Sequence, residues 1–185
     1  MIKKIYKTKI KGLKLFSIKS YKDNRGLFEE IFNKNVLKKN LNFNFENMQT
    51  SVSISKKNVF RGFHFQKKNK QAKYVNVVKG KILDLVIDLR RKSKTFGKVF
   101  SIILSKNNAL GLYIPAGFAH AYFSYENENI IYYKLDNYYN PKFEFGIDFN
   151  DPTLNIKLPR VKIKISKKDR NLLSLDEFKK KFKFL

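Results

Sequence analysis

The chain contains only two histidines, His64 and His120, and each lies in a segment of distinctive composition. His64 lies within residues 61–66 (RGFHFQ), and His120 ends residues 114–120 (IPAGFAH). The unperturbed pKa of a histidine side chain suits proton transfer near neutral pH, so both are candidates for general acid or base chemistry. A lone histidine flanked by phenylalanines is nevertheless more often a hydrogen-bonded core residue than a catalyst. The two histidines alone therefore leave both interpretations open.

The spacing Pro-x-Gly-x-x-His that ends at His120 resembles the second metal-binding motif of cupins. The first cupin motif needs a His-x-His pair, whereas the position two residues after His64 is Gln66. The chain has no cysteine, and no carboxylate lies close to His64 in the sequence, so further metal ligands are lacking. We expect no metal site.

Several other chemistries have no support in the sequence. The chain lacks a Gly-rich dinucleotide fingerprint, a P-loop and a Gly-x-Ser-x-Gly elbow. The absence of cysteine excludes thiol nucleophiles and disulfides. Dehydrogenase, kinase and hydrolase functions are thus unsupported, and we expect no cofactor.

The charge balance is strongly basic, with 40 Lys and Arg residues against 15 Asp and Glu residues and a formal net charge of +25. Such a charge attracts polyanions. Only six of the basic residues are arginine, the residue that base readout and bidentate phosphate contacts favour, and the lysines are scattered. We therefore expect no nucleic-acid partner. No apolar run of about 18 residues and no signal-like start occur, so we also expect no membrane partner and a cytoplasmic location.

The elements that must position these residues are mostly strands. Segments 74–78 and 82–89, joined by residues 79–81 in a hairpin pattern, are followed by strand-like segments 100–104, 112–114, 119–125 and 130–135. The turn residues 23–26 are flanked by strands, and the apolar spacing in residues 29–41 predicts one amphipathic helix. A capping box at residues 174–177 predicts a C-terminal helix. The pattern predicts one all-β domain over residues 1–185, a sandwich or barrel with short peripheral helices.

Taken in order, eight segments between about residues 20 and 170 resemble the dTDP-4-dehydrorhamnose 3,5-epimerase family. They are residues 23–30 (DNRGLFEE), 61–66 (RGFHFQ), 71–73 (QAK), 84–90 (DLVIDLR), 95–97 (TFG), 114–120 (IPAGFAH), 137–141 (NYYNP) and 150–152 (NDP). The resemblance implies a cupin-type jelly-roll barrel, a homodimer, and epimerisation of a nucleotide-diphosphate-linked 4-keto sugar without metal or cofactor.

The resemblance also implies four catalytic residues: His64 as the base, Tyr133 as the acid on the opposite face, Lys73 as the donor to the enolate oxygen, and Asp169 as the carboxylate that orients His64. The chemistry agrees, because a carbon acid is far weaker than an imidazolium and each pKa unit of mismatch costs about 1.4 kcal/mol. A preorganised donor to the oxyanion can supply about 3 to 4 kcal/mol of this. Asp84 is a further hypothesis, as a partner of Lys73.

Other positions of the resemblance imply contacts with substrate. Arg25 and Arg61 are expected at the pyrophosphate, and Tyr139 is expected to stack on the base. The remaining expected contacts with the sugar and nucleotide are Glu30, Asn47, Gln49, His120, Glu144 and Lys168. For Glu144 and Lys168, a solvated surface position is an equally good interpretation.

One departure from the family pattern leaves the substrate open. The family commonly has Gln-Asp-Asn-His-Ser ahead of the catalytic strand, whereas residues 47–51 of this chain are Asn-Met-Gln-Thr-Ser. The nucleotide could therefore be dTDP or GDP, the sugar a 6-deoxyhexose or a heptose, and the reaction confined to C3 or extended to C5, within the synthesis of a bacterial surface polysaccharide. A nucleotide-sugar 3,4-ketoisomerase and a non-enzymatic basic cupin that binds polyanions are the alternatives.

Overall fold

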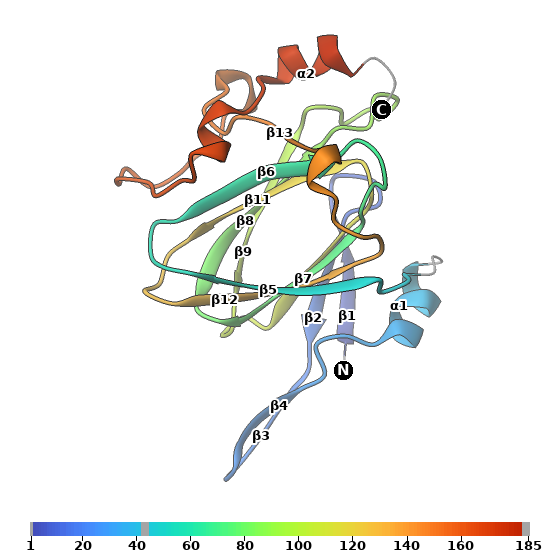
Figure 1. Cartoon of the computed structure of the whole chain (residues 1–185). Coiled ribbons are helices and arrows are strands. Elements are labelled where there is room, and N and C mark those ends of the chain that lie inside the picture. The colour runs from blue at the N-terminus through green and yellow to red at the C-terminus, as the bar shows by residue number, and fades with distance from the viewer. Residues whose placement is uncertain (1, 42–44, 183–185) are drawn as a thin grey trace.

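The computed structural model describes residues 2–41 and 45–182, and two antiparallel sheets dominate it (Figure 1). The six-stranded sheet consists, in spatial order, of β1 (Ile2–Lys7), β2 (Lys14–Ile18), β10 (Leu110–Ile114), β7 (Lys73–Lys79), β12 (Asn129–Leu135) and β5 (Gln49–Ser55). The five-stranded sheet consists of β13 (Glu144–Gly146), β6 (Phe60–Gln66), β11 (Phe118–Ser124), β8 (Lys81–Asp88) and β9 (Val99–Ser105). The sheets face each other as a jelly roll, which confirms the predicted fold class.

The space between the sheets holds one hydrophobic core. Side chains from β7, β10 and β12 meet side chains from β8, β9 and β11, and the buried members from strands are Val75, Val77, Ile82, Val86, Leu104, Leu112, Ile114, Phe118, Tyr122 and Ile131. A second core lies on the outer side of the five-stranded sheet, where the C-terminal helix α2 (Leu175–Lys181) packs. Its Phe178 is fully buried and contacts the rings of Phe65 and Phe182. The predicted capping box of this helix is confirmed, since Ser174 and Glu177 bond reciprocally.

Two predictions about local structure were wrong. Strands β7 and β8 do not form a hairpin, because β7 belongs to the six-stranded sheet and β8 to the five-stranded sheet. Gly80 makes the change of sheet possible: its φ is +81°, and a Cβ there would lie 2.5 Å from the carbonyl oxygen of Glu128. The helix predicted over residues 29–41 is also shorter, since β4 ends at Glu29 and α1 spans Lys34–Leu41.

The remaining elements lie at the periphery. Strands β3 (Ser20–Asp23) and β4 (Gly26–Glu29) form a two-stranded arm that projects away from the two sheets (Figure 1). Three short 3₁₀ helices, η1 (Pro141–Phe143), η2 (Pro152–Leu154) and η3 (Lys168–Asn171), interrupt the segment that leads to α2. Among the described residues, no helix is long and apolar enough to cross a membrane.

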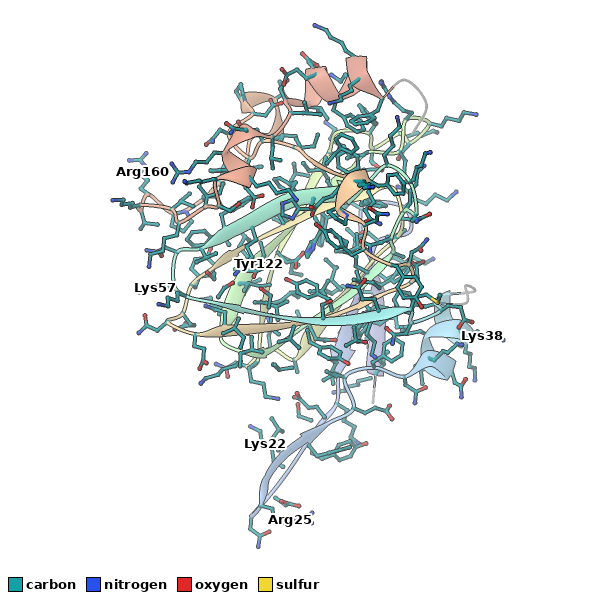
Figure 2. All side chains as sticks on the ribbon, viewed as in Figure 1. Lys22, Arg25, Lys38, Lys57, Tyr122 and Arg160 are labelled. Carbon is teal, nitrogen blue, oxygen red and sulfur yellow. The ribbon has the colours of Figure 1, made fainter. Side chains whose placement is uncertain are left out.

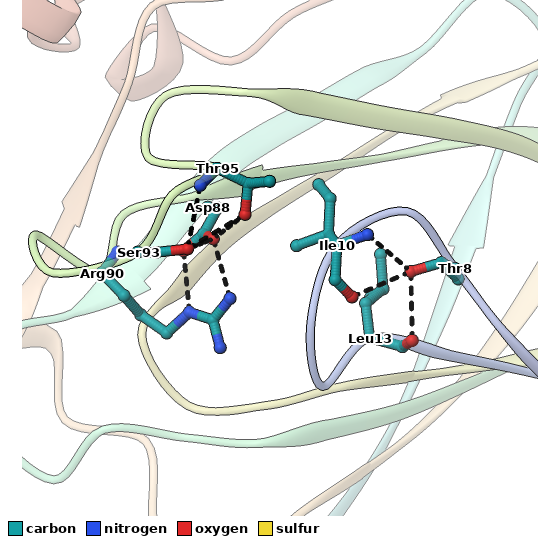
Figure 3. A network of polar contacts seen from close by, with 7 residues as sticks. All are labelled: Thr8, Ile10, Leu13, Asp88, Arg90, Ser93 and Thr95. Carbon is teal, nitrogen blue, oxygen red and sulfur yellow. Dashed lines mark hydrogen bonds and ion pairs between the residues drawn. The ribbon is translucent and has the colours of Figure 1, made fainter.

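The end of β8 is fixed by a buried carboxylate, that of Asp88 (Figure 3). Asp88 accepts hydrogen bonds from the guanidinium of Arg90 and from the hydroxyls of Ser93 and Thr95. Arg90 also lies 4.3 Å from the ring centroid of Phe118 at the start of β11. A buried carboxylate needs such partners, so Asp88 has a structural role in the loop after β8.

Candidate active site

A cavity of about 510 Å³ lies between the two sheets. Its lining residues are Val59, Phe60, Arg61, His64, Lys73, His120, Tyr122, Tyr133, Lys164, Ile165, Ser166, Lys168 and Asp169. A second hollow of about 330 Å³ shares His64, Lys73 and Tyr133 with it and extends toward Gln49, Tyr139 and Glu144. Figure 2 labels Tyr122 in the space between the sheets. The titratable side chains predicted for chemistry therefore line one connected space.

His64 stands at the middle of β6 and bonds to a carboxylate from the far end of the chain. Its Nε2 lies 2.8 Å from Oδ1 of Asp169, on helix η3. Asp169 is buried, and its other oxygen accepts from the backbone N–H of Gly62. Burial alone would raise the pKa of Asp169, but the bond to His64 holds that pKa below its ordinary value. The carboxylate is therefore anionic and fixes the proton of His64 on Nε2, which leaves Nδ1 as the basic nitrogen.

A second carboxylate faces this other nitrogen. Strand β13 pairs with β6 such that Glu144 extends beside His64, and Oε1 of Glu144 lies 3.7 Å from Nδ1 of His64. Its Oε2 accepts from the hydroxyl of Tyr139 at 2.7 Å and forms an ion pair with Lys168. Burial opposes ionisation, but the bonds from Lys168 and Tyr139 keep the pKa of Glu144 below its ordinary value. His64 thus lies between two anionic groups.

Lys73 opens β7 in the opposite sheet and lines the same cavity. Burial lowers the pKa of Lys73 to about 8, against the opposing attraction of Glu144 and Asp84. The amine is thus mostly cationic at neutral pH. A poorly hydrated cation of this kind is a strong donor to an oxyanion.

Tyr133 lies two residues from the partner position of Lys73 on the neighbouring strand β12, and it lines both parts of the cavity. Burial, together with nearby Tyr122 and Asp84, raises the pKa of Tyr133 well above its ordinary value, so its hydroxyl keeps its proton. His120 pairs with His64 across β11 and β6, and its Nε2 lies 2.8 Å from Oδ2 of the buried Asp84. Asp84 thus bonds to His120 and acts on Lys73 only through its charge.

Comparison with known proteins identifies the family of this chain. The family model for dTDP-4-dehydrorhamnose 3,5-epimerase matches residues 7–177. The chain belongs to this family. The dTDP-4-dehydrorhamnose 3,5-epimerase of Methanothermobacter thermautotrophicus is 37% identical over 92% of this chain and 94% of its own. The curated relatives of this chain are epimerases, which are isomerases, and the chain is therefore an isomerase as well.

Solved structures agree with the assignment. The dTDP-6-deoxy-D-glucose-3,5-epimerase of Legionella pneumophila, in complex with dTDP-4-keto-L-rhamnose, superposes with a TM-score of 0.91 at 36% identity, over 94% of this chain and 93% of its own. A 3'-monoepimerase of Streptomyces bikiniensis, in complex with dTDP-quinovose, superposes with a TM-score of 0.89 at 27% identity, over 94% of this chain and 88% of its own. The same fold therefore serves double epimerisation in one of these proteins and single epimerisation in the other.

In this family member, the structure gathers most of the predicted site residues but not all. His64, Lys73, Tyr133, Asp169, Arg61, His120, Gln49, Tyr139, Glu144 and Lys168 line the two parts of the cavity. Asn47 and Glu30 line neither part. Arg25 lies at the tip of the arm, where it pairs with Asp23, away from the cavity of its own chain (Figure 2). Among the described residues, no group of three or more His, Asp or Glu side chains is arranged to hold a metal ion.

Tyr122 also lines the cavity and is not among the residues predicted from the sequence. Its hydroxyl lies 2.7 Å from the hydroxyls of both Ser53 and Ser55, and Ser55 also accepts from Nε of Arg61. Tyr122 is two residues after His120 on β11, so strand alternation places both side chains on one face. That spacing would have been enough to find it once His120 was assigned to the cavity.

Proposed function

We propose that this chain epimerises a nucleotide-diphosphate-linked 4-keto-6-deoxy sugar at C3 and C5, with His64 as the base and Tyr133 as the acid. The observation that carries the proposal is their placement on opposite walls, since His64 is on β6 of one sheet and Tyr133 on β12 of the other. A sugar ring between them would present its two faces to the two groups. Inversion requires the proton to leave one face and return to the other.

Each half of the reaction uses the same residues, and water restores their protonation states afterwards. Nδ1 of His64 takes the proton from the carbon next to the ketone, and the electron pair of the C–H bond forms the enolate. The ammonium of Lys73 stabilises the oxygen that becomes negative, and Asp169 stabilises the imidazolium that forms. The hydroxyl of Tyr133 then delivers a proton to the opposite face of the same carbon. Water then takes the extra proton from the imidazolium of His64 and returns a proton to the phenolate of Tyr133 before the next carbon reacts.

The nucleotide is proposed to occupy the part of the cavity beside β13. Tyr139 is half exposed there and offers a ring on which a base can stack, while Arg61 and Lys168 provide cations for the diphosphate. We propose dTDP as the nucleotide, because related structures carry dTDP-linked ligands. The product keeps its C4 ketone and the nucleotide diphosphate that activates a sugar for glycosyl transfer, so we place the chain in the cytoplasmic synthesis of a surface polysaccharide, with residues 1–185 as one epimerase domain.

We further propose that the active form is a homodimer in which the arm contacts the second copy. Phe28 on the arm is 67% exposed, and Ile54 on edge strand β5 is 62% exposed with Val52 beside it on the same outward face. An arm with an exposed aromatic ring and a sheet edge with exposed β-branched residues are typical of surfaces that need a partner. Such a partner would also bring a second copy's Arg25 near the diphosphate. Phe28→Asp should convert the dimer to a monomer in light scattering; a monomeric wild type would refute this part.

The deciding experiment follows hydrogen exchange at each carbon. The protein is incubated in deuterated water with dTDP-, GDP- and heptose-linked 4-keto sugars, and C3 and C5 are observed by NMR. Deuterium at both carbons of the dTDP sugar supports the proposal, and deuterium at C3 alone reduces it to a 3-epimerase. A product with its ketone at C3 would reveal a 3,4-ketoisomerase, and no exchange with any sugar would refute the assignment. His64→Ala should abolish exchange.

A further inference from the structure

His64 has a carboxylate at each ring nitrogen, and only one of them is needed to orient the ring. Asp169 holds Nε2 at 2.8 Å, which fixes the tautomer. Oε1 of Glu144 lies 3.7 Å from Nδ1, a separation too long for a hydrogen bond but short enough for strong electrostatic attraction to a protonated ring. Glu144 therefore faces the atom that has to accept the substrate proton.

The effect of Glu144 depends on whether Nδ1 carries a proton. While Nδ1 carries a lone pair, the ring is neutral and does not attract the carboxylate. Once Nδ1 is protonated, the ring is an imidazolium and the two groups attract each other. The charge of Glu144 thus favours the state that His64 reaches after it has taken the substrate proton. The opposing influence is Lys168, whose ammonium is paired with the other oxygen of the same carboxylate.

Charged and titratable groups from several elements surround His64. They are Asp169 and Lys168 on η3, Lys164 ahead of η3, Glu144 on β13, Tyr139 before η1, His120 and Tyr122 on β11, Lys73 on β7, Tyr133 on β12 and Arg61 on β6 itself. Of these, only Asp169 and Glu144 form an ion pair with the ring. Lys168, which also lines the cavity, is the cation paired with Glu144, and its side chain is half exposed.

We infer that Glu144 is a positioning residue that sets the charge state of the base, and that Lys168 controls it. A nucleotide diphosphate that draws the ammonium of Lys168 away from Glu144 would leave this carboxylate uncompensated and strengthen its hold on a protonated His64. Binding of the nucleotide end of the substrate would then prepare the base at the sugar end. The link to the nucleotide rests on the proposed function, while the action of Glu144 and Lys168 on His64 does not.

The test uses the fact that the chain has only two histidines. The imidazole signals of His64 and His120 are assigned with a His120→Asn variant and titrated by NMR from pH 5 to pH 9 without substrate. Glu144→Gln should lower the titration midpoint of the His64 ring by about one pH unit, the lower end of what a charge at this distance causes, because Lys168 already offsets part of it. Lys168→Met should raise the midpoint by a similar amount.

Opposite shifts distinguish this role from a purely structural one. If Glu144 and Lys168 only held Tyr139 in place, both variants would disturb His64 in the same way as Tyr139→Phe. The matched control is the ion pair of Glu128 and Lys79 outside the cavity, where Glu128→Gln and Lys79→Met remove the same charges. Both control variants should leave the midpoint within about 0.2 pH units, since exposed charges beyond a Debye length are screened. An unchanged midpoint in Glu144→Gln, or shifts of one sign in both test variants, would overturn the inference.

A titration with dTDP tests the coupling to nucleotide. Saturating dTDP should raise the midpoint of the His64 ring in the wild type more than in Glu144→Gln, because only the wild type has the carboxylate that Lys168 releases. If dTDP shifted the His64 midpoint equally in the wild type and in Glu144→Gln, the coupling to nucleotide would be overturned. The electrostatic role of Glu144 would then be judged by the first titration. Neither titration depends on turnover, so loss of the proposed epimerase activity and failure of this inference are separate outcomes.

Discussion

The pair of His64 and Asp169 offers the sharpest test of the catalytic geometry, through the substitution Asp169→Asn. The side chain keeps its shape, and its carbonyl oxygen can still accept from Gly62 N–H. The group that faces Nε2 of His64 at 2.8 Å changes from an anion to either an amide N–H donor or a neutral acceptor. As a donor, the amide stabilises the tautomer that carries its proton on Nδ1. That tautomer has no lone pair directed at the substrate.

A lower and an upper bound can be given for the loss of exchange rate in Asp169→Asn. A hydrogen bond to a charged group contributes about 1.5 to 3 kcal/mol, and at 1.36 kcal/mol per decade its loss slows proton abstraction about 10- to 150-fold. The wrong tautomer adds to this, and loss of the orienting carboxylate in a comparable triad lowers the rate about 10⁴-fold. We therefore expect deuterium incorporation at C3 to slow by about 10² to 10⁴ in Asp169→Asn.

The assay is single-turnover exchange at C3 in deuterated water, followed by NMR. Asp169→Ala removes the charge without offering an amide, so its exchange rate relative to that of Asp169→Asn measures the cost of the imposed tautomer. Asp176→Asn is the matched control, because Asp176 is an exposed carboxylate that pairs with Lys179 in α2. If Asp169→Asn exchanged within about threefold of the wild type, the assignment of His64 Nδ1 as the base would be refuted, since this ratio is below the smallest loss expected for the hydrogen bond.

Three further outcomes are expected. Since the pKa of Lys73 is lowered to about 8, its cation is present below that pH and is lost above it, so the exchange rate should fall above about pH 8, and Lys73→Arg should move this fall to higher pH. Tyr133→Phe should still incorporate deuterium at C3 but form epimerised product at least about 100-fold more slowly, because only return of the proton to the opposite face is impaired, as NMR of the product would show. Phe178→Ala should lower the free energy of unfolding by about 3 to 5 kcal/mol in a denaturant titration, because it empties a fully buried site under α2.

The fold class could be predicted from the sequence, but the pairing of strands could not. Alternating apolar residues around Gly80 are equally compatible with a hairpin and with a strand that passes to the opposite sheet. In the fold, the carbonyl oxygen of Glu128 comes close to Gly80 from 48 residues away along the chain. Local patterns carry no information about such contacts. The same limit explains why residues 29–33 were included in a helix that begins only at Lys34.

The site residues divide in the same way. His64 could be recognised by its type, but its partner Asp169 lies 105 positions later and was found only through the family resemblance. Lys73 is one of many lysines, and only its position at the start of β7 distinguishes it. Arg25 was expected at the pyrophosphate, yet a single copy of the chain holds it on the arm. In the proposed dimer Arg25 would serve the neighbouring copy, and the fold of one chain cannot assign such a residue to a site.

The charge distribution around the cavity also helps to distinguish an enzyme from a protein that binds polyanions through its lysines. A polyanion-binding surface would present cations without opposing carboxylates, so that phosphate contacts release counterions. Here Asp84, Glu144 and Asp169 all lie beside His64 or His120, and each has an ionisable partner whose proton or charge it influences. Asp84 and Asp169 are buried and Glu144 is half-buried, and carboxylates held away from water in this way would cost folding free energy if they had no partners. The many exterior lysines account for the net charge, whereas the paired acids and bases inside are suited to moving protons on a small substrate.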